Sequence, residues 1–496
     1  MSTSVEIQQE IEIDEYHQLS LWERMSYGFG DFANNLTFGT VGGFLALYMT
    51  TVNAVGTLTA GFIFLFVRIV NVFWDPAVGT FVDKRTSKAG KYRPWILRAG
   101  VPLMIFSLLM FAPLPFTKAN VPFAFITYLL MDLIYSVVNI PYGSLNASLT
   151  RDPESVDKLT TTRMMLANMA NLLVYTLFPM FVQMASPKDK HLQDTGFFGL
   201  KLNLGTYTDP SAQHAWFSVY LIYAILGGIA FFLCYYFTKE RVVATKEQSA
   251  QVRTMDLFSE LRHNRPLLIL GLFFMLSFTF MFFMNTVNGY FNQYVVGKSN
   301  WMGAIGLIAS IPGIVFPVFW PMLKRFFGKK GFFHFFLGMF IVGELLTWAW
   351  SLDGMHDALW LAYLSTFLKQ WGLTSATGFM WALVPEVVSY GELQSGKRNA
   401  GIINALMGIF FKIGFTLGGA IPLWFLAAYG FNEHSTTQHA DAIFGINVTA
   451  IWIPIILAFI SMIIMHIYPI SDADIKDINK KLDAKRAHIK AEEATL

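Results

Sequence analysis

The sequence contains few charged residues and almost no cysteine. Asp, Glu, Lys and Arg make up 14% of its 496 residues, whereas 54% are hydrophobic and 16% are aromatic. Because a soluble domain of this length cannot bury so much apolar surface, the composition indicates a chain that lies in lipid. The single cysteine, Cys234, excludes an internal disulfide and a thiolate metal cluster.

Other absences narrow the classes of function. Residues 1–25 are acidic and show no basic start followed by an apolar core, so no cleavable signal peptide is expected. The 10 histidines form no metal-ligand spacing, and neither a metal nor an organic cofactor is predicted. A formal net charge of +3 is too small to suggest nucleic-acid binding, and no obligatory protein partner is evident. The expected partners are membrane lipid and a small molecule.

The sequence does contain a series of long apolar runs. A bilayer core about 30 Å thick needs about 20 apolar residues per helix. Twelve runs meet this length, and they predict an all-α polytopic membrane protein. The expected spans are 26–51, 57–82, 94–113, 121–149, 159–185, 214–238, 265–295, 301–323, 332–352, 357–385, 399–429 and 442–468.

The longest polar connections divide these twelve helices into two groups. Residues 186–213 and 239–264 are the longest, and the second connection lies between the sixth and seventh expected helices. This pattern predicts an N-terminal tail (1–24), an N-terminal six-helix lobe (25–238), a central loop (239–264), a C-terminal six-helix lobe (265–468) and a C-terminal tail (469–496).

Lys and Arg gather in the loops that follow the even-numbered helices. Because basic residues in short loops stay on the cytoplasmic side, both termini are expected in the cytoplasm, with the chain in the cell (plasma or inner) membrane. The stretch "GTFVDKRTSKAGKYRP" after the second helix has a counterpart, "PMLKRFFGKKG", after the eighth, as a duplicated transporter predicts. The alternative is that any cytoplasmic loop collects basic residues. We expect a cytoplasmic gate formed by Asp83, Lys84, Arg85, Lys91 and Arg93.

The second expected helix keeps polar residues inside the apolar stretch "RIVNVFWDP". Arg68, Asn71 and Asp75 are three and four residues apart, so they share one helical face. A charge at mid-bilayer costs about 3 kcal/mol on insertion scales, which favours a face turned toward a cavity or a partner. Asp75 is therefore a candidate proton or cation acceptor, with Arg68 as a neighbouring charge that adjusts its pKa. The alternative is a static Arg–Asp bridge that holds helices together.

Three further expected helices carry polar residues in helical register. Amide, phenol and carboxylate groups on one face suit a hydroxyl-rich ligand, since each sugar hydroxyl both donates and accepts hydrogen bonds. A single Asn more often holds helices together, but four such faces in one bundle favour a polar cavity. The residues concerned are Asp31, Asn34 and Asn35; Asp132, Tyr135, Asn139, Tyr142 and Asn146; and Asn285, Asn288 and Asn292.

A lysine and two tryptophans complete the candidate cavity. Lys412 lies more than ten residues from either end of the eleventh expected helix, too deep to snorkel to water. Its partner must come from another helix, and Asp75 and Asp31 are the candidates. Trp381 and Trp74 could stack on a pyranose ring, although any single tryptophan more often belongs to the core or to an interfacial belt.

Four segments of the sequence resemble a known family. "YGFGDFANN", "RIVNVFWDPAVGTFVDKRTSKAGKYRPW", "YSVVNIPYGSL" and "VPEVVSYGE" are similar to segments of the glycoside–pentoside–hexuronide:cation symporters of the major facilitator superfamily. The resemblance runs from Tyr27 to about Tyr468. It implies the major facilitator fold, a central cavity between two six-helix lobes, and alternating access. The relatives most similar in the first two helices transport xylosides, glucuronides or lactose.

The resemblance also implies a coupling site. In melibiose-transporting members, two aspartates four residues apart on the second helix form the cation site, and here they correspond to Asn71 and Asp75. Trp74 replaces an asparagine-like ligand and Ser136 replaces a threonine. Since sodium needs several oxygens whereas a proton needs one basic site, these departures favour proton coupling. Sodium is the alternative ion.

The sugar-binding positions of the family can be carried over in the same way. They match Asn35, Tyr135, Asn139, Gly143, Arg163 and Lys412. Two carboxylates of the family are amides here and a stacking tryptophan is glycine, so the expected pocket is more neutral and roomier. Asp31 is a candidate to restore a carboxylate to this wall.

These observations together predict a secondary active transporter and not an enzyme. We expect proton-coupled symport of a glycoside or oligosaccharide, such as a pentoside (xyloside) or a galactoside. A sodium-coupled symporter and a sugar/sugar exchanger are the nearest alternatives. A polytopic membrane enzyme would need a catalytic constellation that the sequence order does not reveal. A channel would not require an intramembrane lysine opposite an acid.

Overall fold

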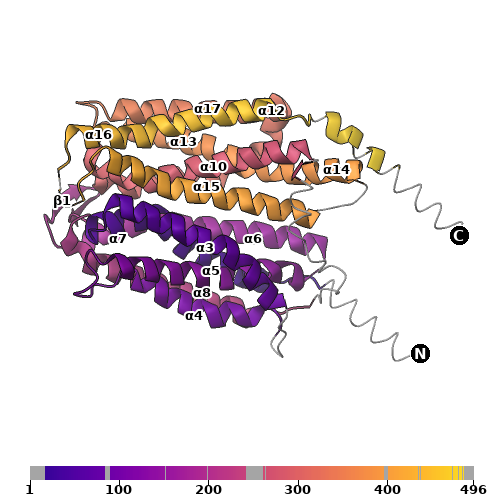
Figure 1. Ribbon diagram of the computed structural model, residues 1–496, viewed down its shortest axis with the longest axis horizontal. Helices are drawn as coiled ribbons and strands as arrows, with labels where there is room; N and C mark the ends of the chain where they lie inside the picture. Colours follow the sequence, from indigo (N-terminus) through magenta and orange to yellow (C-terminus); the bar gives the residue numbers. More distant parts are fainter. Residues whose placement is uncertain are drawn as a thin grey trace, which may run out of the picture. The chain divides into compact units, whose positions relative to one another are not determined.

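The computed structural model is predominantly helical, and its contacts group into two compact units. Unit 1 consists of Met1–Ser249, Asn285–Ser310 and Gly419–Ile446, and unit 2 of Ala250–Met284, Ile311–Gly418 and Asn447–Leu496. Figure 1 labels the main elements. The structure describes residues 17–83, 90–150, 152–197, 199–241, 261–262, 264–395, 400–433, 435, 437–471, 473–478, 480–482 and 484.

The N-terminal half of the chain folds into long helices and one β-hairpin, all within unit 1. The strands β1 and β2 pair in an antiparallel register that sets His191 opposite Leu204. The elements are α2 (Leu21–Thr40), η1 (Val41–Leu45), η2 (Tyr48–Val52), α3 (Thr57–Asp83), α4 (Arg93–Leu109), α5 (Val121–Leu149), α6 (Pro153–Leu172), η3 (Leu173–Leu177), α7 (Phe178–Ala185), β1 (His191–Asp194), β2 (Lys201–Leu204), η4 (Pro210–Ala212) and α8 (Gln213–Phe237).

The regular elements of the C-terminal half are all helices among its described residues, and they are divided between the two units. The end of α10, the first part of α11 and the end of α15 belong to unit 1. The elements are α10 (Arg265–Tyr290), η6 (Phe291–Val295), η7 (Ser299–Trp301), α11 (Met302–Val315), η8 (Phe316–Phe319), α12 (Trp320–Trp350), α13 (Leu359–Phe379), η9 (Met380–Leu383), α14 (Val384–Ser395), α15 (Ala400–Ala428), α16 (Ala440–Asn447), η10 (Val448–Trp452) and α17 (Ile453–His466).

Several helices begin at residues that cap free backbone N–H groups. Ser20 and Glu23 form a reciprocal capping box at the start of α2. Asn120 caps α5 and Asp152 caps α6, and each of these two helices has a proline in its first turn. The starts of these three helices are therefore determined by the local sequence.

Small residues let the helices of unit 1 approach closely. The helix α2 packs against α6 and α8, α4 against α5 and α8, and α3 against α5. Figure 1 labels α3, α4, α5 and α8 in this group. A Cβ atom added at Gly30 would lie 2.2 Å from the Tyr142 ring, and one at Gly28 would lie 2.6 Å from Leu166. Glycine at these positions keeps α2 within reach of polar side chains on α5 and α6.

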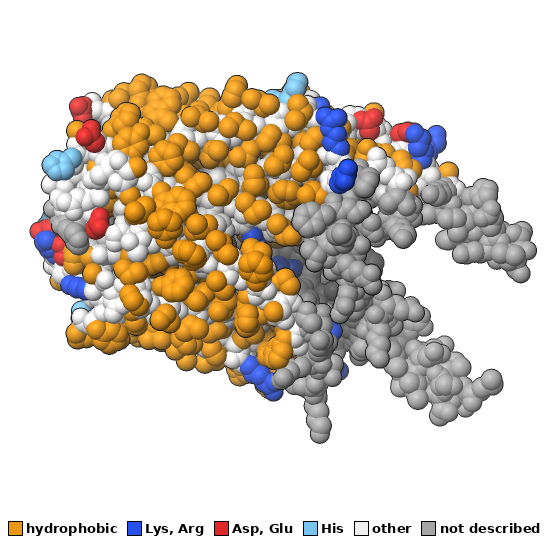
Figure 2. Space-filling view, in the orientation of Figure 1, with side chains coloured by type: hydrophobic (Ala, Val, Ile, Leu, Met, Phe, Trp, Pro, Cys, Tyr) orange, Lys and Arg blue, Asp and Glu red, His pale blue; other side chains and the backbone are white. Residues whose placement is uncertain are grey.

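The surface of the helices is apolar. Large hydrophobic side chains are exposed on them, among them Phe73, Val318 and Phe459. In the face drawn in Figure 2, hydrophobic side chains cover the helices and most of the charged side chains lie toward the helix ends. Within the described part of the chain, 9 helices are long and apolar enough to cross a membrane. The total of twelve crossings stays a prediction.

The expected spans coincide with helical segments, but the structure differs from them in detail. The span expected at 159–185 is interrupted by the π-helical turn η3, and α12 begins earlier than expected and breaks at Gly328, where φ is 69°. The hairpin in the expected loop 186–213 was not predicted. The six-helix lobes also stay a prediction, because the contacts place segments of both halves of the chain in unit 1.

Candidate functional site

A cluster of buried polar side chains joins α3 to α5. Arg68 donates to Oδ1 of Asp132 at 2.8 Å and to the Tyr128 hydroxyl at 3.2 Å. Asn71 donates to Oδ2 of Asp132, and Ser136 donates to Oδ1 of Asn71 at 3.1 Å. We call Arg68, Asn71, Tyr128, Asp132 and Ser136 the α3–α5 cluster. It contains three of the four residues predicted for the coupling site.

The partner of Arg68 in this cluster is not the one expected from the sequence. Arg68 was expected to act on Asp75 of the same helix, and Asp132 was expected on a ligand-facing stripe outside the coupling site. The sequence feature that could have assigned Asp132 to the coupling site is its position one helical turn before Ser136 on α5. Asp75 lies in α3, one turn beyond Asn71, and is partly exposed. Nearby, the Trp74 indole donates to the Leu133 carbonyl at 2.9 Å.

A second polar group joins α2 to α6. Nε of Arg163 donates to Oδ2 of Asp31 at 2.6 Å, and Nη2 of Arg163 donates to Oδ1 at 3.4 Å. The Asp31 and Arg163 side chains are 17% and 22% exposed. The Asn35 side chain donates to the Asp31 carbonyl at 2.8 Å. Asp31, Asn35 and Arg163, all predicted to bind substrate, therefore come together.

Two tyrosines support this Asp31–Arg163 pair. The Tyr27 hydroxyl donates to the Tyr142 carbonyl at 2.7 Å and the Tyr142 hydroxyl to the Tyr27 carbonyl at 2.9 Å, with the rings stacked 4.6 Å apart. The guanidinium carbon of Arg163 lies 5.3 Å from the Tyr27 ring centroid and 5.5 Å from that of Tyr142. The backbone N–H of Asp31 also donates to the Tyr142 hydroxyl at 3.1 Å. These contacts fix both charged side chains, and sequence reasoning did not foresee the role of Tyr27.

The other predicted binding residues of the first half differ in exposure. Asn34 is 4% exposed, so it lies inside unit 1, and its role in substrate binding stays a prediction. Tyr135 stacks on Phe38 with the ring centroids 5.8 Å apart, and Asn139 is exposed on α5. Tyr135 and Asn139 thus remain accessible to a ligand.

The remaining predicted binding residues lie in the second half of the chain. Asn285 and Asn288 are in the part of α10 that belongs to unit 1, and Asn288 is exposed. Trp381 and Lys412 belong to unit 2. The Trp381 ring packs edge-on against Phe274, with centroids 4.8 Å apart, and remains 47% exposed. Lys412 is partly exposed in the middle of α15.

The predicted gate residues are only partly described. Lys84 and Arg85 lie outside the described residues, as does the side chain of Asp83. The backbone N–H groups of Lys91 and Arg93 each donate to the Glu240 carboxylate at 2.8 Å. The Arg93 guanidinium also donates to the Tyr235 carbonyl at 2.8 Å. The start of α4 is therefore anchored to the segment after α8.

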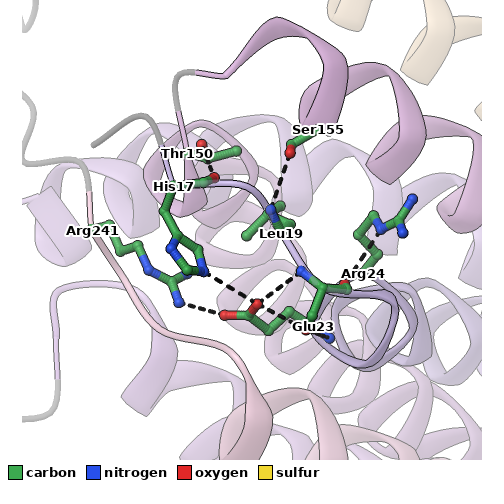
Figure 3. Close-up of polar contacts among 8 residues, drawn as sticks. His17, Leu19, Glu23, Arg24, Thr150, Ser155 and Arg241 are labelled. Carbon is green, nitrogen blue, oxygen red and sulfur yellow. Dashed lines mark hydrogen bonds and ion pairs between the residues drawn. The ribbon is translucent and has the colours of Figure 1, made fainter. Parts of the chain in front are cut away.

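A second anchor at the same end of unit 1 holds the start of α2 (Figure 3). Arg241 donates to the Glu23 carboxylate, and the His17 ring lies 3.6 Å from it. Burial raises the pKa of Glu23, but hydrogen bonds from Arg241 and Ser20 outweigh it and leave the pKa below the usual value of 4.5. Glu23 is thus held as a carboxylate.

At the opposite end of unit 1, the two halves of the chain meet. The Tyr290 hydroxyl lies 2.6 Å from the Thr50 hydroxyl and donates to the Ala46 carbonyl at 3.1 Å. A Cβ atom at Gly306 of α11 would lie 2.1 Å from the Tyr175 carbonyl oxygen. Segments from the two halves of the chain therefore pack closely at this end of unit 1.

Unit 2 contains a buried acid–base pair of its own. Glu344 of α12 is completely buried, and Nζ of Lys369 on α13 lies 3.7 Å from its carboxylate. Both oxygens of Glu344 lack a hydrogen-bond donor among the described residues. The two helices cross closely here, since a Cβ atom at Gly343 would lie 2.4 Å from the backbone nitrogen of Lys369. Neither Glu344 nor Lys369 was among the residues predicted from the sequence.

Comparison with solved structures identifies the fold. The chain is similar to the crystal structure of the nucleoside transporter NupG with a TM-score of 0.61 at 16% identity, over 90% of this chain and 99% of that chain. The chain therefore shares the fold of that protein.

Comparison of sequences then gives the family. The chain matches the family "MFS/sugar transport protein" over residues 26–472 and belongs to it. It is 32% identical over 470 residues to the uncharacterized symporter YnaJ of Bacillus subtilis, covering 94% of this chain and 95% of that protein. It is 29% identical to a glucuronide carrier protein homolog of Escherichia coli, covering 95% and 97%. It is 28% identical to the isoprimeverose transporter of Lactiplantibacillus pentosus, covering 92% and 90%.

These matches confirm the resemblance to glycoside–pentoside–hexuronide:cation symporters. The protein is a multi-pass membrane transporter of the major facilitator superfamily with a small-molecule sugar as its class of substrate, and it is not an enzyme.

Proposed function

We propose that the protein carries a neutral glycoside, of the pentoside or galactoside type, in symport with a proton. The observation that favours a neutral sugar is the contact between Asp31 and Arg163. Both Nε and Nη2 of Arg163 already donate to the Asp31 carboxylate, so a sugar carboxylate would have to displace an internal anion. A neutral sugar can instead donate to Asp31 and accept from Asn35 or Asn139 without breaking the pair. Among the relatives, this favours a substrate like that of the isoprimeverose transporter over a glucuronide.

The proposal of a proton as the coupling ion rests on the composition of α3. Asn71 supplies an amide where the family has a carboxylate, which leaves Asp75 as the acid of that helical face. A proton needs one basic oxygen, whereas a sodium ion needs several oxygens around it. Protonated Asp75 would favour sugar binding, and release of the proton and sugar inside would reset the carrier. Neither an organic cofactor nor a bound metal is part of this proposal.

The proposed mechanism is alternating access, with both termini in the cytoplasm. In this orientation the contact of Tyr290 with Thr50 closes the extracellular end of unit 1. The segment after α3, with Asp83, Lys84, Arg85, Lys91 and Arg93, forms the opposite gate, which holds the outward-facing state. The gate is a conformational element and does not bind the sugar.

Uptake into proteoliposomes tests the proposed function. Purified protein is reconstituted, and uptake of labelled isoprimeverose and of a labelled glucuronide is measured with a pH gradient, with a sodium gradient or with neither. We expect the pH gradient alone to drive accumulation of the neutral sugar. Accumulation that follows sodium and ignores pH would contradict the proton coupling. Uptake of the glucuronide alone would contradict the neutral substrate, and sugar exchange without response to either gradient would identify an exchanger.

A further inference from the structure

Asp132 lies in unit 1 at the point where the coupling residues of α3 and α5 meet, and the proposed function assigns it no role. Its side chain is 3% exposed, and both carboxylate oxygens accept hydrogen bonds, Oδ1 from Arg68 and Oδ2 from Asn71. Ser136, one turn further along α5, links back to Asn71 at 3.1 Å. A buried carboxylate held in this way is an expensive group to retain in a membrane helix unless it has a partner or a function.

Asn71 cannot bind a proton, because a side-chain amide does not titrate at accessible pH. The group that Asn71 contacts can. Its amide nitrogen donates to Asp132, so the proton-binding oxygen beside position 71 comes from α5 and not from α3. Arg68 reaches the same carboxylate from the preceding turn of α3, with a separation of 2.8 Å. Any shift of α3 along α5 therefore changes the distance between the guanidinium group and the carboxylate.

Among the described residues, few other titratable groups lie around Asp132. Tyr128 and Tyr135 of α5 interact electrostatically with it, and Asp31 of α2 interacts with Tyr135. Arg68 of α3 is the positive charge in direct contact. Protonation of Asp132 would therefore weaken its attraction to Arg68.

Two further elements need to be considered. The helix α4 also packs against α5, but its charged residues Arg93 and Arg98 lie in its first two turns, whereas Asp132 lies in the middle of α5. Asp75 lies on α3 one turn beyond Asn71. Of the described residues, Arg68 is therefore the cation placed to compete with a proton for Asp132.

We propose that Asp132 is a second proton-binding carboxylate of the coupling site, and that Arg68 and the transported proton compete for it. This inference rests on the proposed proton-coupled symport and assigns a further residue to it. In the Arg68-bound arrangement the carboxylate is ionised. When α3 moves and withdraws Arg68, one oxygen of Asp132 takes one proton, an O–H bond forms, and Arg68 keeps its positive charge. Loss of that proton to the cytoplasm restores the ion pair.

The first experiment separates coupling from sugar translocation. Asp132→Asn and the wild type are compared in proteoliposomes, using the sugar that the wild type accumulates. With one proton per sugar, a pH difference of one unit supports about tenfold accumulation. We expect Asp132→Asn to fall to a ratio of about one while exchange of labelled for unlabelled sugar stays within about twofold of wild type. Asp477→Asn, the same chemical change at an exposed position in the short helical stretch 473–478 near the C-terminus, controls for expression and reconstitution.

A double variant distinguishes a loss of coupling from misfolding. The double variant Asn71→Asp with Asp132→Asn keeps one amide and one carboxylate and only moves the carboxylate from α5 to the facing position on α3. Because the two side chains are already in contact, we expect the double variant to recover at least threefold accumulation. Asp132→Glu should likewise retain part of the accumulation and shift the pH at which uptake is half-maximal. A purely structural role would move neither readout.

Each outcome bears on a different claim. If the wild type does not accumulate sugar in a pH gradient, the proposed function fails and the inference falls with it. If Asp132→Asn accumulates sugar at the wild-type ratio, the inference alone is overturned. If Asp132→Asn loses exchange and accumulation together and the double variant recovers neither, Arg68 and Asp132 form a static bridge, which also overturns the inference.

Discussion

Each unit contains a deeply buried acid–base pair that joins two helices, Asp132 with Arg68 in unit 1 and Glu344 with Lys369 in unit 2, and these two pairs are built differently. In unit 1, Asp132 accepts hydrogen bonds from Arg68 and Asn71 on both oxygens. In unit 2, the nearest cation to Glu344 is Nζ of Lys369 at 3.7 Å, beyond hydrogen-bond distance, and neither Glu344 oxygen has a donor in the described part of the unit. Burial alone therefore does not indicate how strongly an acid is held in its charged form.

The difference follows from the residues that surround each acid. A planar guanidinium group and an amide can satisfy a carboxylate from two sides, whereas a lysine ammonium on a flexible stem offers a single point charge. Breaking a well-paired buried bridge leaves an uncompensated charge and is costly, whereas removing a poorly paired acid removes a group that was already unfavourable. The pairs should therefore respond in different ways to neutralisation.

The largest effect is expected at Arg68. Replacing Arg68 by Met leaves the Asp132 carboxylate buried without its cation, which should cost about 3–5 kcal/mol of stability. We expect a fall of the thermal midpoint in detergent by several degrees, measured by size-exclusion chromatography after heating. The double variant Arg68→Met with Asp132→Asn should recover most of the loss. A midpoint that stays within one degree of wild type for the single variant would show that the pair contributes little.

A smaller effect is expected at Glu344. Its replacement by Gln removes a charge whose oxygens accept no hydrogen bond in the described structure, so stability should change by no more than about 1 kcal/mol and can rise. The measurement is the same thermal midpoint, compared with that of Arg68→Met. If Glu344→Gln lowered the thermal midpoint as much as Arg68→Met does, the two pairs would contribute equally to stability, and the difference argued between them would be wrong.

The Asp31–Arg163 pair provides an intermediate case, because its side chains are 17% and 22% exposed. Asp31→Asn should leave the fold intact and free the Arg163 guanidinium for an anionic ligand. The ratio of glucuronide uptake to neutral-glycoside uptake should then rise about tenfold, corresponding to about 1.4 kcal/mol. The matched control is Asp209→Asn, which disrupts a pair with Lys188 in the connection before α8 and should leave the ratio unchanged. An equal loss of both uptakes in Asp31→Asn would argue against a role in selectivity.

The sequence predicted much of the helical architecture but only part of the polar site. Hydrophobic length fixed the positions of the helices, and one-face spacing placed Arg68 and Asn71 on the face that meets α5. It could not reveal that Arg68 binds Asp132, because the choice between partners on different helices depends on helix rotation and depth. Nor could it show that Asn34 is buried while Asn139 is exposed, since both lie on apolar helices in similar register. The hairpin of β1 and β2 was missed because its strands are only four residues long and lack a strong alternating pattern.

The smallest effect is expected outside the membrane, at Glu23, where a pair is well satisfied but accessible to solvent. Hydrogen bonds from Arg241 and Ser20 outweigh the effect of burial and lower the pKa of Glu23 below 4.5. The stability that this lowered pKa contributes is present above the unfolded-state pKa and is lost as the pH falls through the folded-state value. Because the side chain is partly hydrated, we expect a contribution of about 0.5 kcal/mol. Glu23→Gln should lower the thermal midpoint slightly at pH 7 and flatten its decline below pH 5. If the thermal midpoint of Glu23→Gln declined below pH 5 as steeply as that of the wild type, the pH dependence would belong to carboxylates other than Glu23.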